Sequence, residues 1–292
     1  KAPNGNRDGE TNLGDLITDA LVWGAKQNGE TVDAAITNGG GIRATIKAGD
    51  ITKKDVNTVL PFGNTLSIVK VTGTELLEAL EASTYCTPDA LGGFPQVSGI
   101  QFTIDTGKSY DAGALYPDST YHAPKSINRV TIQSVGGKAF DEKAVYTIAT
   151  NDFMAAGGDT YYAFKAASAN YNIGVPMDEV LMDYIKTELK GVVGETYVKP
   201  QGRITLTKTE APAEEPAKPA EPAQPSTPAQ PAKPADGDGG ETSYTVVSGD
   251  CLWNIAYRHY GSGAKFTMIA EANGLKDPYL INIGQVLVIP AA

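Results

Sequence analysis

The sequence has few of the residues that most often bind metals or form cross-links. It contains two cysteines, Cys86 and Cys251, and two histidines, His122 and His259, among 292 residues. A Pro-rich stretch separates the members of each pair, so we expect neither a disulfide nor a shared metal site. So few cysteines are ordinary both in proteins secreted by Gram-positive bacteria and in the cytosol, and they do not identify the compartment.

Basic residues and long apolar runs are also scarce. The 24 Lys and Arg residues are outnumbered by 34 Asp and Glu residues, which gives a formal charge of −10. This balance argues against a nucleic-acid groove, which needs clustered positive charge. No apolar run reaches the roughly 20 residues of a membrane helix. The start, KAPNGNRDGE, lacks both a Met and an apolar segment, so we expect an internal or processed chain without a signal peptide.

Proline and alanine are abundant in one place, between residues 208 and 242. The stretch KTEAPAEEPAKPAEPAQPSTPAQPAKPADGDGGE contains no aromatic or large aliphatic residue. Such a composition cannot bury a core, so we predict a disordered, extended linker that is largely polyproline II. The linker divides the chain into a domain at 1–207 and a smaller domain at 243–292.

Helix and strand patterns are mixed within the first domain. Apolar residues recur at helical spacing in 11–28, 73–84 and 177–191. The strand candidates are DAAIT, LSIVKVT, GIQFTID, RVTIQSV, AVYTIAT and GRITL. Because helices and strands do not alternate as regular βα repeats, we predict an α+β fold with a mixed sheet.

Six motifs of this domain occur in a particular order. They are RDGETNLGDLITDAL (7–21), TNGGGIR (37–43), LPFGNTL (60–66), FPQVSGIQFTID (94–105), NDFMAAGGDTY (151–161) and GRI (202–204). Their order, spacing and content resemble the C-terminal domain of the 5′-nucleotidases, a family that includes UDP-sugar hydrolases and cyclic-nucleotide phosphodiesterases. The resemblance spans nearly all of residues 7–206. It implies that this mixed α/β domain holds a nucleoside, while the family's N-terminal domain carries two metals and the catalytic Asp–His pair.

The resemblance also implies ligand contacts at particular positions. Phe62 and Phe153 would sandwich the base, an interaction that tolerates different bases. Asp159 would accept hydrogen bonds from the ribose hydroxyls, and Asn38 would touch the base edge. The structural alternatives are core packing for each Phe and a simple turn at Asp159, which follows two glycines.

The TNGGGIR segment places three glycines between an asparagine and an arginine. It matches neither a Walker loop nor a dinucleotide-binding pattern. We expect Gly40 and Gly41 to let the backbone approach the ligand. The resemblance places Arg43 and Arg7 near phosphate or ribose, where a guanidinium binds paired oxygens, and the alternative for Arg43 is a surface salt bridge. Arg203 is expected to be structural.

The second domain shows a strand, two helices and a closing strand. Its segments YTVVSGDCLW, IAEANGL and INIGQVLVIP resemble the LysM module, a βααβ unit whose family binds N-acetylglucosamine polymers such as peptidoglycan. The resemblance implies a glycan groove between two loops, with Cys251 standing where the family commonly has Thr. The groove residues would be Gly249, Asp250, Cys251, Leu252, Ile281, Asn282 and Ile283.

Two functions are compatible with these features. In the first, the chain is the nucleotide-binding specificity part of a secreted, cell-wall-attached 5′-nucleotidase of a Gram-positive bacterium. This sequence lacks the dense Asp, His and Asn cluster that two divalent metals need, so those metals would lie in a domain before Lys1 and this chain would be inactive alone. In the second, the chain is a non-catalytic, wall-attached binding or structural protein.

Overall fold

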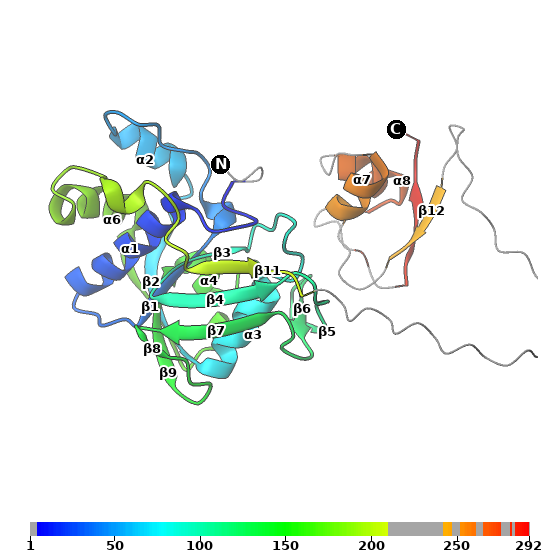
Figure 1. The fold of residues 1–292 in the computed structure, drawn as a ribbon, viewed down its shortest axis with the longest axis horizontal. Coiled ribbons are helices and arrows are strands. Elements are labelled where there is room, and N and C mark those ends of the chain that lie inside the picture. Colours follow the sequence, from blue (N-terminus) through cyan, green and yellow to red (C-terminus); the bar gives the residue numbers. More distant parts are fainter. Residues whose placement is uncertain are drawn as a thin grey trace, which may run out of the picture. The chain divides into compact units, whose positions relative to one another are not determined.

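The computed structural model describes residues 5–209, 242–246, 252–260, 265–275, 281 and 284–291. The chain forms two compact units, Lys1–Lys208 and Thr209–Ala292 (Figure 1). The linker predicted at 208–242 lies, except for its ends, outside the described residues.

The first sheet of the larger unit has five strands in the order β10-β2-β9-β1-β3. Their bounds are β1 Ala34–Asn38, β2 Thr65–Thr72, β3 Pro95–Ser98, β9 Val145–Asn151 and β10 Ala169–Pro176. β1 and β9 are parallel, and the other neighbouring pairs are antiparallel. This is the mixed sheet that the irregular order of elements predicts.

A second sheet has the order β11-β4-β7-β8. Its strands are β4 Ile100–Asp105, β7 Val130–Val135, β8 Lys138–Ala139 and β11 Ile204–Thr207, and a separate hairpin pairs β5 Ala112–Leu115 with β6 His122–Pro124. Only Gly99 separates β3 from β4, so the chain passes directly from the first sheet into the second.

Helices cover both faces of the five-stranded sheet. α1 (Asn12–Gln27) contacts β1 and β3 and packs with α6 (Met177–Asp183), and α2 (Lys53–Val59) packs on α6. Figure 1 shows these three helices gathered on one side of the unit. α3 (Gly73–Ser83) contacts β2 of the first sheet and β7 of the second, so it lies between the two sheets.

The core on the α1 side consists of apolar residues that are almost completely inaccessible to water. It includes Leu16, Ile17, Leu21, Val56, Leu66, Ile68, Ala149 and Leu181. Burial of each Leu or Ile contributes about 1.5–3 kcal/mol. The side of α1 that faces this core must therefore be apolar, which gives residues 11–28 their helical periodicity.

The predicted helices are present, but one of them is interrupted, and the structure contains elements that the sequence patterns did not predict. The pattern at 177–191 predicts one helix, whereas α6 ends at Asp183 and a π-helical turn, η2, occupies Tyr184–Glu188. β10 was not predicted, because it is an edge strand with mostly exposed side chains and no apolar alternation. The short helices α4 (Asp152–Ala155) and α5 (Tyr162–Lys165) also lack a periodic signal.

The smaller unit is the predicted βααβ arrangement. β12 (Thr242–Thr245) pairs antiparallel with β13 (Val286–Ile289), and between them come α7 (Leu252–Tyr260) and α8 (Phe266–Ala272). Its core residues are Val246, Leu252, Ile255, Ala256, Ile269, Ala270, Leu287 and Ile289. Neither unit, as far as it is described, contains a helix long and apolar enough to cross a bilayer.

A group of carboxylates holds the C-terminal end of the larger unit against α1. Glu10 accepts hydrogen bonds from three backbone N–H groups within 201–204, at 2.7–2.8 Å. Arg203 donates to Asp19 at 2.7 Å and lies 3.7 Å from Asp15, so Arg203 is structural, as predicted. Burial raises the pKa of Asp15 to about 7; Arg203 opposes this shift and Glu10 adds to it.

The raised pKa of Asp15 predicts that the larger unit loses stability as the pH rises. The folded chain holds a proton on Asp15 that the unfolded chain has released above pH 5, so this contribution is complete at low pH and disappears as the pH passes about 7. Relative to Asp15→Asn, the unfolding free energy should fall by on the order of 2 kcal/mol between pH 5 and 8. Denaturant titrations followed by Trp23 fluorescence in a Trp253→Phe background measure it.

The exposed carboxylate Asp50 provides the control for this experiment. Asp50→Asn should leave the pH dependence of the wild type unchanged, because it removes an exposed carboxylate and leaves Asp15, Glu10 and Arg203 in place. A pH slope that persists in Asp15→Asn would show that another group is responsible.

Candidate functional site

Three strand ends meet at one edge of the five-stranded sheet. β1 and β9 are parallel neighbours, so their last residues, Asn38 and Asn151, lie at the same edge. β2 runs the other way, and its residue Leu66 pairs with Asn151. The turn that carries Phe62 precedes β2 and is therefore brought to this edge as well. Segments that lie far apart in the sequence converge here.

The glycine turn η1 (Gly39–Gly41) follows β1 directly. The backbone N–H groups of Gly39 and Gly40 each donate to a carbonyl oxygen of the 92–94 loop at 2.7 Å. A Cβ on Gly39 would lie 1.8 Å from the carbonyl oxygen of Asn6, so no side chain fits there. A Cβ on Gly40 would lie 2.9 Å from the carbonyl oxygen of Gly92, so the chain approaches protein backbone closely at Gly40 as well. Gly41 borders the pocket described below.

Asn38 and Asp159 are joined directly. The Asn38 Nδ2 donates to Asp159 Oδ2 at 3.0 Å, and Asn38 Oδ1 accepts from Asn151 Nδ2 at 3.1 Å. Both polar atoms of the Asn38 amide are thus used inside the protein, and its side chain is 6% exposed. This geometry gives Asn38 a role in orienting Asp159. Its second Nδ2 hydrogen takes part in no hydrogen bond within the described residues, and the contact with a base edge stays a prediction.

Asp159 combines an unusual backbone with an unusual environment. Its φ is +53°, in the left-handed region that non-glycine residues seldom adopt and that often marks functional sites. Burial raises the pKa of its carboxyl group, while the hydrogen bond from Asn38 and the charge of Arg7 lower it. The glycine loop at 92–93 lies against it: a Cβ on Gly93 would be 3.1 Å from the Asp159 Cβ.

Arg7 and Arg43 bring two positive charges to the same place. Burial, and then the charge of Arg43, lower the pKa of Arg7, and Asp159 opposes the shift. Arg43 is exposed; its Nη1 donates to Gly40 O at 3.2 Å, and its Cζ lies 5.7 Å from the centre of the Phe62 ring. Within the described residues neither guanidinium makes an ion pair, so the salt bridge considered for Arg43 is not found. The pair suits an anion.

Phe62 and Phe153 expose their rings instead of burying them. They are 61% and 43% exposed, so the alternative of core packing is wrong for both. The Phe153 ring lies across Gly158, where a Cβ would come within 2.5 Å of it. Asp152 Oδ1 accepts from the backbone N–H of Thr65 at 3.2 Å and so ties α4 to the start of β2. Adjacent elements therefore carry the two rings.

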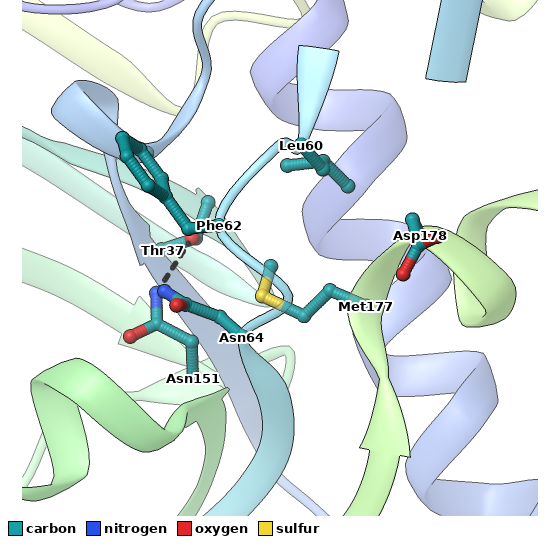
Figure 2. A pocket seen from close by; sticks show the side chains of 8 residues that line it. Thr37, Leu60, Phe62, Asn64, Asn151, Met177 and Asp178 are labelled. Atoms are coloured by element: carbon teal, nitrogen blue, oxygen red, sulfur yellow. Dashed lines mark hydrogen bonds between the residues drawn. The ribbon is translucent and has the colours of Figure 1, made fainter. Parts of the chain in front are cut away.

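A narrow pocket opens beside Phe62 (Figure 2). It is lined by Thr37, Gly41, Leu60, Phe62, Asn64, Asn151, Met177 and Asp178. Figure 2 shows the hydrogen bond between Asn151 and Thr37 among these side chains, at 3.2 Å. The cavity volume is about 10 Å³, which leaves room for roughly one water molecule. A base would therefore stack on the exposed face of a ring, outside this pocket.

Several residues near the site were not predicted as ligand contacts. They are Asn64, Asn151, Met177 and Asp178, which line the pocket, and Gly92 and Gly93, which flank Asp159. Asn151 could have been recognised, because asparagine before a short helical segment is typical of an N-cap. A larger groove of about 1140 Å³ between the 45–53 loop and α6 contains none of the predicted site residues.

Only part of the predicted glycan groove can be placed. Leu252 is buried in the core of the smaller unit, and Ile281 packs against that core. The other predicted groove residues lie outside the described residues; they are Gly249, Asp250, Cys251, Asn282 and Ile283. Leu252 and Ile281 thus support the shape of the module from within.

Family models match both units of the chain. Residues 2–166 match the model described as "5′-nucleotidase, C-terminal domain", and residues 244–290 match the LysM domain. The chain belongs to the 5′-nucleotidase C-terminal domain family and carries a LysM domain.

The relatives of known sequence or structure are much longer than this chain. The trifunctional nucleotide phosphoesterase protein YfkN of Bacillus subtilis is 37% identical over 197 residues, covering 67% of this chain and 12% of that protein. The cell wall protein Lmo0130 of Listeria monocytogenes is 35% identical over 187 residues, covering 62% and 22%. The crystal structure of a 5′-nucleotidase precursor from Thermus thermophilus aligns with a TM-score of 0.56 and 35% identity, covering 68% and 36%. The chain thus spans at most 36% of these three.

The packing of η1 predicts that Gly39→Ala is strongly destabilising. The new methyl group would overlap the Asn6 carbonyl, so the backbone must move and we expect a loss of about 3 kcal/mol in unfolding free energy. Gly194→Ala is the control: Gly194 has an extended backbone and open space at the Cβ position, so its change should stay below about 0.5 kcal/mol. Equal stability of the two variants in urea titrations would contradict the close approach.

Proposed function

We propose that the larger unit holds the nucleoside part of a nucleotide for a secreted, cell-wall-attached 5′-nucleotidase, and that the LysM domain binds peptidoglycan. The observation that carries this proposal is the pair of exposed rings, Phe62 and Phe153, on adjacent elements at one sheet edge. Exposing a phenyl ring to water costs free energy. A flat base held between Phe62 and Phe153 would cover one face of each ring and remove part of this cost.

Each remaining contact has a chemical counterpart in a nucleotide. Asp159 presents carboxylate oxygens that accept hydrogen bonds from ribose hydroxyls. Arg7 and Arg43 offer guanidinium groups, which bind paired phosphate or ribose oxygens. Asn38 orients Asp159 through the hydrogen bond between them. Because stacking on phenyl rings does not select a particular base, we expect broad base specificity.

The hydrolytic step belongs, on this proposal, to a part of the protein encoded before Lys1. Two divalent metals would polarise the phosphate and activate a water there. In the described ranges no group of three His, Cys, Asp or Glu side chains is placed to hold a metal ion, so these residues do not fit such a centre. We therefore assign them substrate binding and no bond-breaking step.

A non-catalytic, wall-attached binding protein is the alternative reading. It has the same nucleoside site and LysM domain but no metal domain. The coding sequence preceding Lys1 distinguishes the two: Asp-x-His and Gly-Asn-His-Asp or Gly-Asn-His-Glu motifs there would identify the enzyme.

We expect Phe62→Ala and Phe153→Ala to weaken binding of adenosine and AMP by the full chain. Stacking of one base on one aromatic ring contributes roughly 1–3 kcal/mol, so each variant should bind roughly 5- to 150-fold less tightly. Isothermal titration calorimetry with detection into the millimolar range measures the affinity, since this chain contributes only one part of the full site.

Tyr171→Ala is the matched control, because Tyr171 is 40% exposed and lies on β10. Its removal should leave adenosine binding unchanged. Absence of binding by the wild type, or equal binding by wild type and both Phe variants, would refute the nucleoside assignment.

The LysM assignment predicts that peptidoglycan sediments the full chain but not a chain truncated after residue 242. The contacts in LysM modules come largely from backbone groups, so loss of the whole module is a sharper test than a side-chain change. Retention of the truncated chain on peptidoglycan would instead place wall binding in the larger unit. As a control, the truncated chain should bind adenosine with the same affinity as the full chain.

A further inference from the structure

We infer that Asn151 is a positioning residue that sets both the orientation of the Asp159 carboxylate and the place of the Phe153 ring. It acts through an asparagine relay, which we define as the hydrogen-bonded series Met154 N–H, Asn151, Asn38 and Asp159. The inference rests on the proposed nucleoside site, to which it adds a buried residue that no ligand would touch.

The direction of the asparagine relay is fixed at its first member. A backbone N–H can only donate, and that of Met154 donates to Asn151 Oδ1 at 2.8 Å. The Asn151 Nδ2 must then face Asn38 Oδ1, which it does at 3.1 Å. This leaves the Asn38 Nδ2 to face Asp159 Oδ2 at 3.0 Å. Amide orientation is decided by such networks, and here one backbone group decides it for both asparagines.

The last member of the asparagine relay is thereby kept as an acceptor. An amide N–H directed at Asp159 Oδ2 favours the ionised carboxylate over the protonated acid. The other oxygen, Oδ1, accepts no hydrogen bond from the residues that the structure describes. Gly92 leaves room beside it, since even an added Cβ there would be 3.8 Å away. Oδ1 is thus suited to a ligand that brings hydroxyl donors.

Asn151, the second member of the asparagine relay, also fixes the aromatic ring. Asn151 is the N-cap of α4, the four-residue helix that carries Phe153. So short a helix has little stability of its own, and a good cap is worth about 1 kcal/mol to it. Asn151 is 1% exposed, and the pocket that it lines has room for about one water molecule, so a nucleoside does not reach it. One buried side chain therefore couples the stacking ring to the ribose acceptor.

Asn151→Asp is the informative substitution, because it separates capping from the asparagine relay. The new carboxylate still accepts from Met154 N–H, since Asp caps helices as well as Asn does. Its second oxygen, however, would face Asn38 Oδ1, and two acceptors repel. The Asn38 amide must turn over, which directs Asn38 Oδ1 at the carboxylate of Asp159.

We expect Asn151→Asp to lower Tm by about 5 °C and to weaken adenosine binding at least tenfold, although Phe62, Phe153 and Asp159 are unchanged. In an Asp159→Asn background the same substitution should cost less than half as much in Tm. There the asparagine relay can run in reverse, with Asn38 donating to residue 151 and accepting from the amide at 159. A residue that only caps α4 would show the same Tm loss in both backgrounds.

Asn172→Asp is the matched control. Asn172 likewise accepts from a backbone N–H, that of Gly174, and donates to a threonine hydroxyl, that of Thr65, both at 2.7 Å, but it has no link to Asp159. Its Tm loss should be the same with Asp or Asn at position 159, and adenosine binding should be unchanged.

The Tm measurements on the single and double variants and the adenosine titration test different claims. Additive Tm changes for Asn151→Asp and Asp159→Asn, or undiminished adenosine binding by Asn151→Asp, would overturn the inference. Failure of the wild type to bind adenosine would instead overturn the proposed function, and the Tm coupling between positions 151 and 159 would still decide whether the asparagine relay exists.

Discussion

The pairing of β9 with parallel β1 on one side and antiparallel β2 on the other is the constraint on which the candidate site depends. It brings the end of β1, the end of β9 and the start of β2 to one edge, with Leu66 opposite Asn151. Every residue of β1 is buried, because helices cover both faces of the sheet. A slip of one residue would exchange the side chains on the two faces, so packing specifies the register strongly. The site inherits its geometry from this register.

Burial at this edge explains why its polar residues bond to one another. Thr37, Asn38 and Asn151 are each no more than 6% exposed, and a buried amide without a partner costs about 1–3 kcal/mol. The strands cannot satisfy side-chain amides, so the polar groups satisfy one another and, at the end, Asp159. The same arrangement that avoids this cost leaves an acceptor and two exposed rings at the surface. One network thus satisfies the buried polar groups and, on the proposed function, also positions the groups that would bind the nucleoside.

The sequence allows those parts to be predicted whose signal is local. α1 and α3 follow from apolar periodicity, α3 with a capping box at Thr72 and Glu75, and the mixed sheet follows from the irregular order of strands. The partner of Asn38 could not be predicted, because Asp159 lies 121 positions away and only the β1–β9 pairing brings it near. β10 gave no signal because it lies at the edge of the sheet and most of its side chains are exposed. Such a strand does not need the alternating apolar residues from which a strand is predicted. The family motifs marked Asn38 and Asp159 as ligand residues but did not reveal their mutual bond.

On the proposed function, the position of Arg43 indicates which face of the Phe62 ring a base would occupy. Its guanidinium lies over one face of the Phe62 ring while Nη1 is held by Gly40 O. A cation–π contact at an exposed position contributes about 0.5–1 kcal/mol. A base that displaced the guanidinium would have to replace this contact and break the bond to Gly40. A base on the opposite face keeps both and extends the stack from guanidinium to phenyl to base. We therefore favour the opposite face, which leaves the remaining N–H groups of Arg43 able to reach a phosphate while its plane still supports Phe62.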